Sequence, residues 1–230
     1  MNWKMIYLAR RNPALAAEDF AQAWREHSAL GRQCRNVGQR VRSVTQCSRL
    51  LDLALPGASS DYDGVNLLLL ADRESARAIW SDPETLAIMR PDEPRVFDRY
   101  VREFTLVCRE AVLRDGERSP VVLHGFLRRR ADLGEADIRV AWQAADPARP
   151  WLGGALGQAA ARIVVNEVVE APPPGYAYDL IVEWWFESAA ALQRAVGDQD
   201  LRSHLRPALA ALLDLPGSVF MATQVTHRRP

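Results

Sequence analysis

The sequence predicts an α+β fold built from two similar domains, and an internal repeat is the main reason. The chain has 230 residues, enough for one large domain or two of ordinary size. Arg10-Arg11 recurs as Arg128-Arg129, 118 positions later. Tyr62-Asp63 recurs as Tyr178-Asp179 at an offset of 116. A period this long excludes a solenoid and indicates a duplicated domain.

Each element of the first half follows from its hydrophobic pattern. Residues 3–9 form a short apolar run typical of a strand, and residues 10–13 turn the chain. Phe20, Trp24 and His27 share one face of an amphipathic helix, because four and then three positions separate them. Two further strands are predicted at 41–51 and 65–70, a helix at 74–80 and a last strand at 101–108.

The second half gives the same order of elements. Strands are predicted at 121–127, 162–170, 180–186 and 219–226, with helices near 134–144 and 189–195. The polar, turn-rich segment 115–120 marks the boundary, which predicts one domain at 1–114 and another at 120–230. The order β-α-β-β-α-β is the ferredoxin-like arrangement, with both helices on one face of an antiparallel sheet. Because the third strand of each half is apolar on both faces, we expect the two sheets to pack face to face.

Composition narrows the class of protein. Hydrophobic residues make up 48% of the chain and charged residues 25%, which is typical of a soluble protein with a sizeable core. The formal net charge is zero without a basic stripe, so a nucleic-acid partner is not expected. The sequence shows neither a signal-peptide pattern nor a membrane-length apolar run, which predicts a cytoplasmic protein without a membrane partner.

Several kinds of site are not expected from the sequence. It has no nucleotide-binding glycine loop, no G-x-S-x-G and no H-E-x-x-H. Four scattered histidines and three cysteines without a C-x-x-C spacing make a metal site unlikely by pattern, so no metal is predicted. The cysteines are expected to be packing residues in a reducing compartment.

Segments of the first half resemble the EthD family of the dimeric α/β-barrel superfamily. They are Arg10-Arg11-Asn12-Pro13 after the first strand, Trp24-Arg25-Glu26-His27, Trp80-Ser81-Asp82-Pro83-Glu84, and Asp92-Glu93. The resemblance covers most of residues 3–110 and, more faintly, 120–228. It implies a barrel of two ferredoxin-like sheets around a central apolar cavity. Fusion of two copies implies that one chain forms a complete barrel by itself. Whether two such chains associate as a homodimer stays an open question.

The resemblance selects His27 as the first candidate catalytic residue. An imidazole at the end of the first helix could act as an acid or base, or hold a substrate oxygen. The alternative is a half-buried helix histidine that bonds a backbone carbonyl and orders the next loop. The residue 118 positions later is Ala145, so the second half has lost any such role.

Two further catalytic candidates, Glu183 and His124, stand where the first half has the apolar residues Leu67 and Ile6. A carboxylate in a strand covered on both faces should have a raised pKa, which suits an acid or base near neutral pH. Because their strands are neighbours in a ferredoxin-like sheet, we expect Glu183 to pair with His124 in the cavity. The alternatives for Glu183 are an arginine salt bridge or exposure at an edge, and for His124 a satisfied strand position.

Candidate substrate-binding residues are Tyr7, Arg10, Trp24, Trp184 and Trp185. Since strand side chains alternate, one of the adjacent tryptophans should face the cavity. The same alternation places Asn66 and Glu183 on opposite faces of their sheets. Lys4 is the only lysine, and its position near the terminus argues against Schiff-base chemistry.

These observations favour a cofactor-independent enzyme. The resemblance implies a lyase, cyclase or isomerase acting on a small aromatic or polyketide-like molecule, with a cofactor-free monooxygenase as a variant. Some branches of the superfamily bind haem. The alternative is a non-catalytic ligand-binding or accessory protein of an aromatic-catabolism or polyketide pathway.

Overall fold

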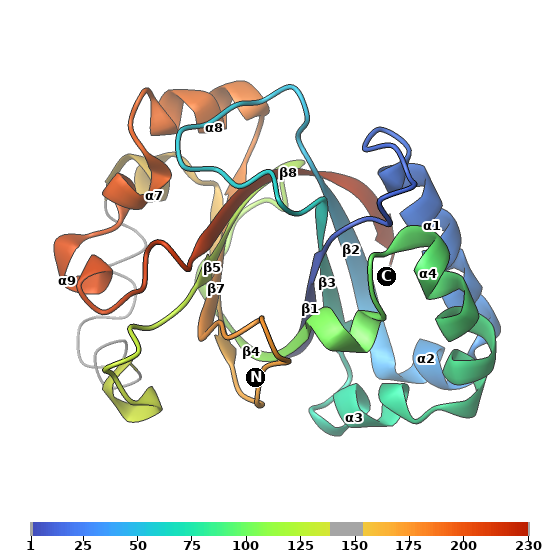
Figure 1. Cartoon of the computed structure of the whole chain (residues 1–230). Coiled ribbons are helices and arrows are strands. Elements are labelled where there is room, and N and C mark those ends of the chain that lie inside the picture. Colours follow the sequence, from blue (N-terminus) through green and yellow to red (C-terminus); the bar gives the residue numbers. More distant parts are fainter. Residues whose placement is uncertain (1, 139–153, 230) are drawn as a thin grey trace.

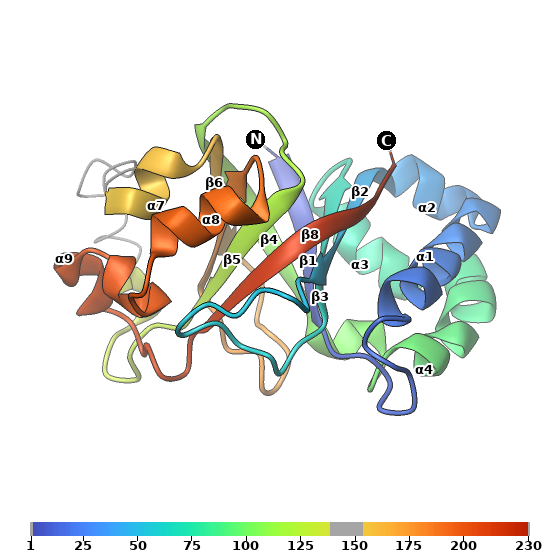
Figure 2. The ribbon, with the colours of Figure 1, turned by 90° about the horizontal axis from the view of Figure 1, so that it is seen from above.

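A closed barrel of eight antiparallel strands forms the centre of the computed structural model, which describes residues 2–138 and 154–229. Helices cover two opposite flanks, α1 to α4 on one side and α7 to α9 on the other (Figures 1 and 2). The strands follow the order β1-β3-β2-β8-β5-β7-β6-β4 around the barrel. The predicted α+β class is confirmed.

The first half contains twelve elements in the described part of the chain. They are β1 (Asn2–Ala9), α1 (Phe20–Leu30), η1 (Gly31–Gln33), α2 (Arg35–Arg40), β2 (Val41–Arg49), β3 (Gly64–Leu70), α3 (Glu74–Trp80), η2 (Thr85–Met89), η3 (Arg90–Asp92), α4 (Glu93–Val96), η4 (Val101–Phe104) and β4 (Thr105–Arg114). The segment η2 is a π-helix, a conformation that often occurs at functional sites. The first three strands lie where the hydrophobic runs predict them, within two residues at each end. The last strand was predicted at 101–108 but spans Thr105–Arg114, because Val101–Phe104 form the 3₁₀ helix η4.

The second half follows with the same alternation of strands and helices. Its described elements are β5 (Val121–Leu127), α7 (Gly154–Ala159), β6 (Arg162–Val168), β7 (Leu180–Phe186), α8 (Ala189–Val196), η5 (Leu201–His204), α9 (Pro207–Ala210) and β8 (Val219–Arg229). Most of the predicted helix near 134–144 lies outside the described residues. Residues 115–120 connect β4 to β5.

The two halves contribute four neighbouring strands each, in equivalent orders. The order is β4-β1-β3-β2 in the first half and β8-β5-β7-β6 in the second. Ladders between β2 and β8 and between β4 and β6 join them into one continuous sheet. The sheets therefore cover each other within one chain as expected, and they do so as a hydrogen-bonded barrel without a free edge.

Equivalent contacts recur at the ends of equivalent strands. Asp63 accepts a hydrogen bond from the backbone N–H of Arg11 at 2.9 Å, and Asp179 accepts one from Arg129 at 2.8 Å. The guanidinium of each arginine forms an ion pair with the same aspartate. The offsets of 118 and 116 residues in the sequence thus correspond to the same contact in space.

Strand side chains alternate between two covered environments. One set points into the barrel, and the other packs beneath the helices of its own half. Among the described residues, no helix has the length and apolar character needed to cross a membrane.

Candidate functional site

A row of three polar side chains crosses the helix-covered face of the first half. Tyr7 of β1 lies opposite Asn66 of β3, which lies opposite Gln46 of β2. All three line a cavity of about 60 Å³ between the sheet and the helices. We call this space the helix–sheet cavity.

The equivalent row in the second half is apolar. Gly125 of β5 lies opposite Val182 of β7, which lies opposite Val165 of β6. A Cβ atom added to Gly125 would stand 3.2 Å from the ring of Trp184, so this ring occupies the space beside the glycine. The polar cavity is thus a feature of the first half that the described second half does not repeat.

Helix residues close the helix–sheet cavity. Its further lining includes Trp24 and His27 of α1, Ile79 and Trp80 of α3, Thr85 and Met89 of η2, Glu93 of α4, and Arg229 of β8. A dry cavity that holds benzene has a volume of about 150 Å³. An aromatic ring therefore enters only if lining side chains move. Trp80 and Met89 are only partly buried, and methionine is flexible, so they are the side chains able to yield.

His27 lines this cavity and is buried, whereas the structural alternative described a half-buried histidine. Its side chain is 6% exposed, and Nδ1 lies 3.0 Å from Oδ2 of Asp92. Burial lowers the pKa of His27, which outweighs the opposing effect of Asp92. Because a carboxylate only accepts hydrogen bonds, the neutral imidazole donates from Nδ1 and keeps Nε2 as an acceptor. The partner of Nδ1 is thus a carboxylate and not a backbone carbonyl, and Ala145 lies outside the described residues.

Arg95 is the second partner of Asp92 and keeps its carboxylate ionised. Burial would raise its pKa, but hydrogen bonds from Arg95 and His27 hold it below the usual value. Nε of Arg95 lies 2.7 Å from Oδ1 of Asp92. The result is an arginine–aspartate–histidine chain that ends at the cavity.

Glu93 adds a buried carboxyl group that the sequence prediction missed as a site residue. It is 7% exposed, and Oε2 accepts a hydrogen bond from the Val101 N–H at 2.8 Å. Burial raises the pKa of Glu93 despite that bond. Burial and then the charge of Glu93 raise the pKa of the Tyr7 hydroxyl. The only signal in the sequence was the Asp92-Glu93 pair of the EthD resemblance.

Two amide oxygens of the polar row, Oδ1 of Asn66 and Oε1 of Gln46, are buried without a partner in the described part of the protein. Nε2 of Gln46 donates to the Trp24 carbonyl at 3.3 Å, which fixes the amide. Because buried polar atoms are nearly always satisfied, such acceptors beside a cavity are suited to a ligand hydroxyl or amine.

The barrel interior holds the second group of predicted residues. Glu183 has a side chain 1% exposed, and its Oε1 lies 2.7 Å from Nζ of Lys4. Asn166 and the Trp185 indole also donate to Glu183, at 2.8 and 3.0 Å. Nζ of Lys4 lies 2.8 Å from Glu110 as well. The partner of Glu183 is therefore Lys4, and the expected pair with His124 is wrong.

The lysine changes the ionisation of this carboxylate. Burial would raise the pKa of Glu183, but the charge of Lys4 and the further contacts, including hydrogen bonds from Lys4 and Asn166, together outweigh it and hold the pKa below the usual value. The expected raised pKa is therefore wrong. Burial opposes protonation of Lys4, yet Glu183 and Glu110 raise its pKa, so Lys4 remains an ammonium. Schiff-base chemistry is disfavoured by this charge and not by the position of Lys4 in the sequence.

His124 lies opposite Glu183 in the β5–β7 ladder. It is fully buried, and neither ring nitrogen has a partner among the described residues. Burial lowers its pKa to about 4, so the ring is neutral. The cavity beside Lys4 and Glu183 measures only about 30 Å³, close to the volume of one water molecule. The expected apolar cavity at the barrel centre is thus replaced by packed side chains and an ion-pair cluster.

The predicted binding residues separate into three places. Tyr7 and Trp24 line the helix–sheet cavity, and Trp185 lines the small barrel cavity. Trp184 packs in the apolar core beneath the second-half helices, so its predicted cavity role is wrong. Arg10 stacks 4.4 Å from the Tyr62 ring centroid and donates to the Asp61 carbonyl at 2.9 Å. It lines neither cavity.

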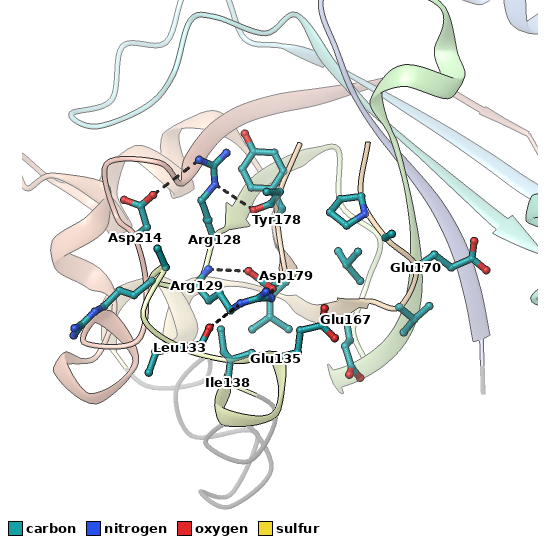
Figure 3. A pocket seen from close by; sticks show the side chains of 18 residues that line it. Arg128, Arg129, Leu133, Glu135, Ile138, Glu167, Glu170, Tyr178, Asp179 and Asp214 are labelled. Atoms are coloured by element: carbon teal, nitrogen blue, oxygen red, sulfur yellow. Dashed lines mark hydrogen bonds and ion pairs between the residues drawn. The ribbon is translucent and has the colours of Figure 1, made fainter. Parts of the chain in front are cut away.

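A third cavity, the largest of the three described, measures about 500 Å³ and opens at the ends of β5 and β7 (Figure 3). Its three consecutive arginines each have a carboxylate partner. Arg129 pairs with Asp179, Arg128 lies 4.0 Å from Asp214, and Arg130 lies 2.6 Å from Asp132. Because these charges are compensated within the protein, the helix–sheet cavity is the better candidate site. No group of three or more metal-ligating side chains occurs in residues 2–138 and 154–229.

Comparison with known proteins finds a family match within the first half. Residues 12–100 match the EthD domain. The match includes His27, Asn66, Asp92 and Glu93, so most of the polar groups of the helix–sheet cavity belong to this domain. No curated protein sequence matches the chain.

Solved structures resemble the whole chain and not the EthD domain alone. An anthrone oxidase-like protein superimposes with a TM-score of 0.62 at 13% identity, covering 99% of this chain and 92% of that one. A candidate monooxygenase from Fusobacterium nucleatum subsp. nucleatum gives 0.58 at 6% identity, covering 99% and 94%. A candidate chlorite dismutase gives 0.52 at 9% identity, covering 97% and 94%. At these identities the likeness establishes the fold alone.

Proposed function

We propose that the EthD half is an enzyme that performs acid–base chemistry on a small aromatic or polyketide-like molecule in the helix–sheet cavity. The observation that carries the proposal is the polar row Tyr7–Asn66–Gln46 beside the His27–Asp92 pair, opposite an apolar row in the second half. A row needed only for packing would be apolar in both halves. The neighbours named as an oxidase and a monooxygenase support an enzyme.

In this proposal His27 is the general base. Nε2 accepts a proton from the substrate, while the bond from Nδ1 to Asp92 orients the ring and stabilises the imidazolium that forms. The free oxygens of Asn66 and Gln46 accept hydrogen bonds from substrate hydroxyl groups. Glu93, with its raised pKa, is the group suited to return a proton.

The reaction that we favour is cofactor-free oxygenation, since proton removal from a phenol or an activated CH₂ group gives an electron-rich carbanion that O₂ can oxidise. For an anthrone-type substrate the balance is CH₂ + O₂ → C=O + H₂O. Carbon loses four electrons and O₂ gains them. Lyase, cyclase and isomerase reactions begin with the same proton abstraction, so the base would serve them equally.

The origin of the two halves is also part of the proposal. We infer that residues 1–114 and 120–230 descend from one ferredoxin-like EthD-type domain by duplication and fusion. Equal strand orders and the recurring arginine–aspartate contact support this origin. Loss of the polar row from the second half then left one acid–base cavity per chain.

Oxygen uptake with anthrone as substrate tests the proposed reaction. The wild-type protein should consume one O₂ for each anthraquinone formed. His27→Asn should lower turnover at least tenfold, since general-base catalysis contributes about 10²- to 10⁴-fold. His204→Asn is the matched control, because that histidine lies in η5 and contacts the Val196 carbonyl at 3.1 Å. Full activity of His27→Asn would contradict the proposal, and so would anthrone binding without turnover, which the ligand-binding alternative predicts.

A further inference from the structure

The mouth of the helix–sheet cavity carries an arginine from the opposite half. Arg229, at the end of β8, lies opposite Val44 of β2 and lines the cavity. A Cβ atom on Gly31 would stand 3.5 Å from Nη2 of Arg229 and 3.6 Å from Sδ of Met89. The guanidinium therefore lies over the backbone of η1, beside a flexible side chain of the cavity wall.

Arg229 belongs to a group of basic side chains that have no carboxylate partner in the described part of the chain. Burial and then Arg32 lower the pKa of Arg229. Burial and then Arg25, Arg229 and Arg32 lower the pKa of His227. None of these four side chains forms a salt bridge with an acidic residue in the described part of the chain, and Nε of Arg229 is buried without a partner there. We call Arg25, Arg32, His227 and Arg229 the mouth cluster.

This arrangement differs from the rest of the arginine-rich surface. The three arginines around the largest cavity all have carboxylate partners. Arg95, which lies near the same helices as the mouth cluster, binds both Asp92 and Glu26. Uncompensated positive charge at the rim of a largely buried cavity attracts and concentrates anions.

The inner wall of the cavity differs from its rim. Tyr7, Asn66 and Gln46 are buried there, and burial raises the pKa of Glu93, which favours its neutral form. Arg229 is only partly buried. A ligand anion is therefore attracted to the rim, which sets one orientation, with the anionic group outward and the ring inward.

We propose that the helix–sheet cavity binds a small aromatic carboxylic acid as its anion, with the carboxylate held by Arg229 and the ring directed toward Tyr7 and His27. The planar guanidinium can donate two parallel hydrogen bonds to one carboxylate. Arg25 and Arg32 supply the surrounding positive field. This inference rests on the proposed function for the location of the site, and it adds the chemical class of the ligand and its direction of binding.

Benzoate and its neutral isostere benzamide test the inference on the full-length protein. Binding is measured by calorimetry and by quenching of tryptophan fluorescence, since Trp24 and Trp80 line the cavity. Benzoate should bind at least tenfold more tightly than benzamide, and its affinity should fall as salt is added. Arg229→Gln should remove the preference for benzoate.

Arg228→Gln is the matched control. Arg228 is the preceding residue of β8, and its guanidinium lies 5.8 Å from the Trp185 ring centroid, away from the helix–sheet cavity. It should bind benzoate like the wild type. Equal binding of benzoate and benzamide, no binding of either, or an equal loss in both variants would overturn the inference. The assay measures binding without turnover. A negative result therefore does not decide the outcome of the anthrone test of His27.

Discussion

Nζ of Lys4 lies 2.7 Å from Oε1 of Glu183, which joins the first strand of one half to the third strand of the other across the barrel. Their side chains are only 8% and 1% exposed. The single lysine of the chain therefore compensates two buried carboxylates, since Glu110 is its second partner. A buried charge is tolerated only while its partner is present.

Lys4→Met should destabilise the barrel strongly. Removing the ammonium leaves Glu183 and Glu110 buried without their cation, and breaking a buried pair in this way costs about 3–5 kcal/mol. Urea unfolding should show the loss as a lower midpoint. The double variant Lys4→Met/Glu183→Gln should recover part of it. An unchanged unfolding free energy in Lys4→Met would show that solvent reaches the cluster.

Acid should destabilise the protein through His124. Its pKa falls from 6.5 in the unfolded chain to about 4 in the fold, so the unfolded state binds the proton more readily. Stability is therefore complete above pH 6.5 and declines as the pH falls toward about 4, by roughly 3 kcal/mol from this residue.

His124→Phe should flatten that part of the stability curve. His27, whose pKa is also lowered, contributes in the same direction and remains in the variant. The informative quantity is thus the difference in slope between wild type and variant from pH 4 to 6.5. Identical slopes would mean that His124 is hydrated in solution.

Asp92→Asn should change both the size and the pH dependence of activity. The amide cannot stabilise the imidazolium of His27, so turnover should fall about a hundredfold. Asp92 raises the pKa of His27, and its neutralisation therefore moves the acidic limb of kcat/KM to lower pH. A loss of turnover without that shift would assign Asp92 a purely structural role.

Leu68→Trp should close the helix–sheet cavity. Leu68 lines it, and the corresponding residue 116 positions later is Trp184, which fills the equivalent space in the second half. Ligand affinity should fall at least tenfold, while the added volume costs about 1–3 kcal/mol of stability. Leu68→Met is the volume-conserving control. Normal binding by Leu68→Trp would place the ligand elsewhere.

Most of the strand framework could be predicted from the sequence because hydrophobic runs mark it directly. Alternation also placed Asn66 and Glu183 on opposite faces, which the structure confirms. Alternation alone does not identify the barrel-facing side, because helices cover one face of each sheet and the opposite sheet covers the other. For that reason the sequence could not show which of Trp184 and Trp185 faces the barrel interior.

The site was harder to predict because its contacts join distant segments. Lys4 and Glu183 are 179 positions apart, and no pattern near either residue in the sequence indicates that they are in contact. Arg229 reaches the first-half cavity from the last strand of the second. Glu93 lies in a four-residue helix, too short for a periodic pattern to reveal its buried face.

The cross-barrel bond between Lys4 and Glu183 joins two different strands and occurs once in this chain. In a symmetric pair of identical subunits every substitution appears twice, so the interior would hold two lysines and two glutamates. A single chain escapes this constraint, and each half can accept changes that the other lacks. One half is then free to evolve new chemistry while the other preserves the scaffold that both require.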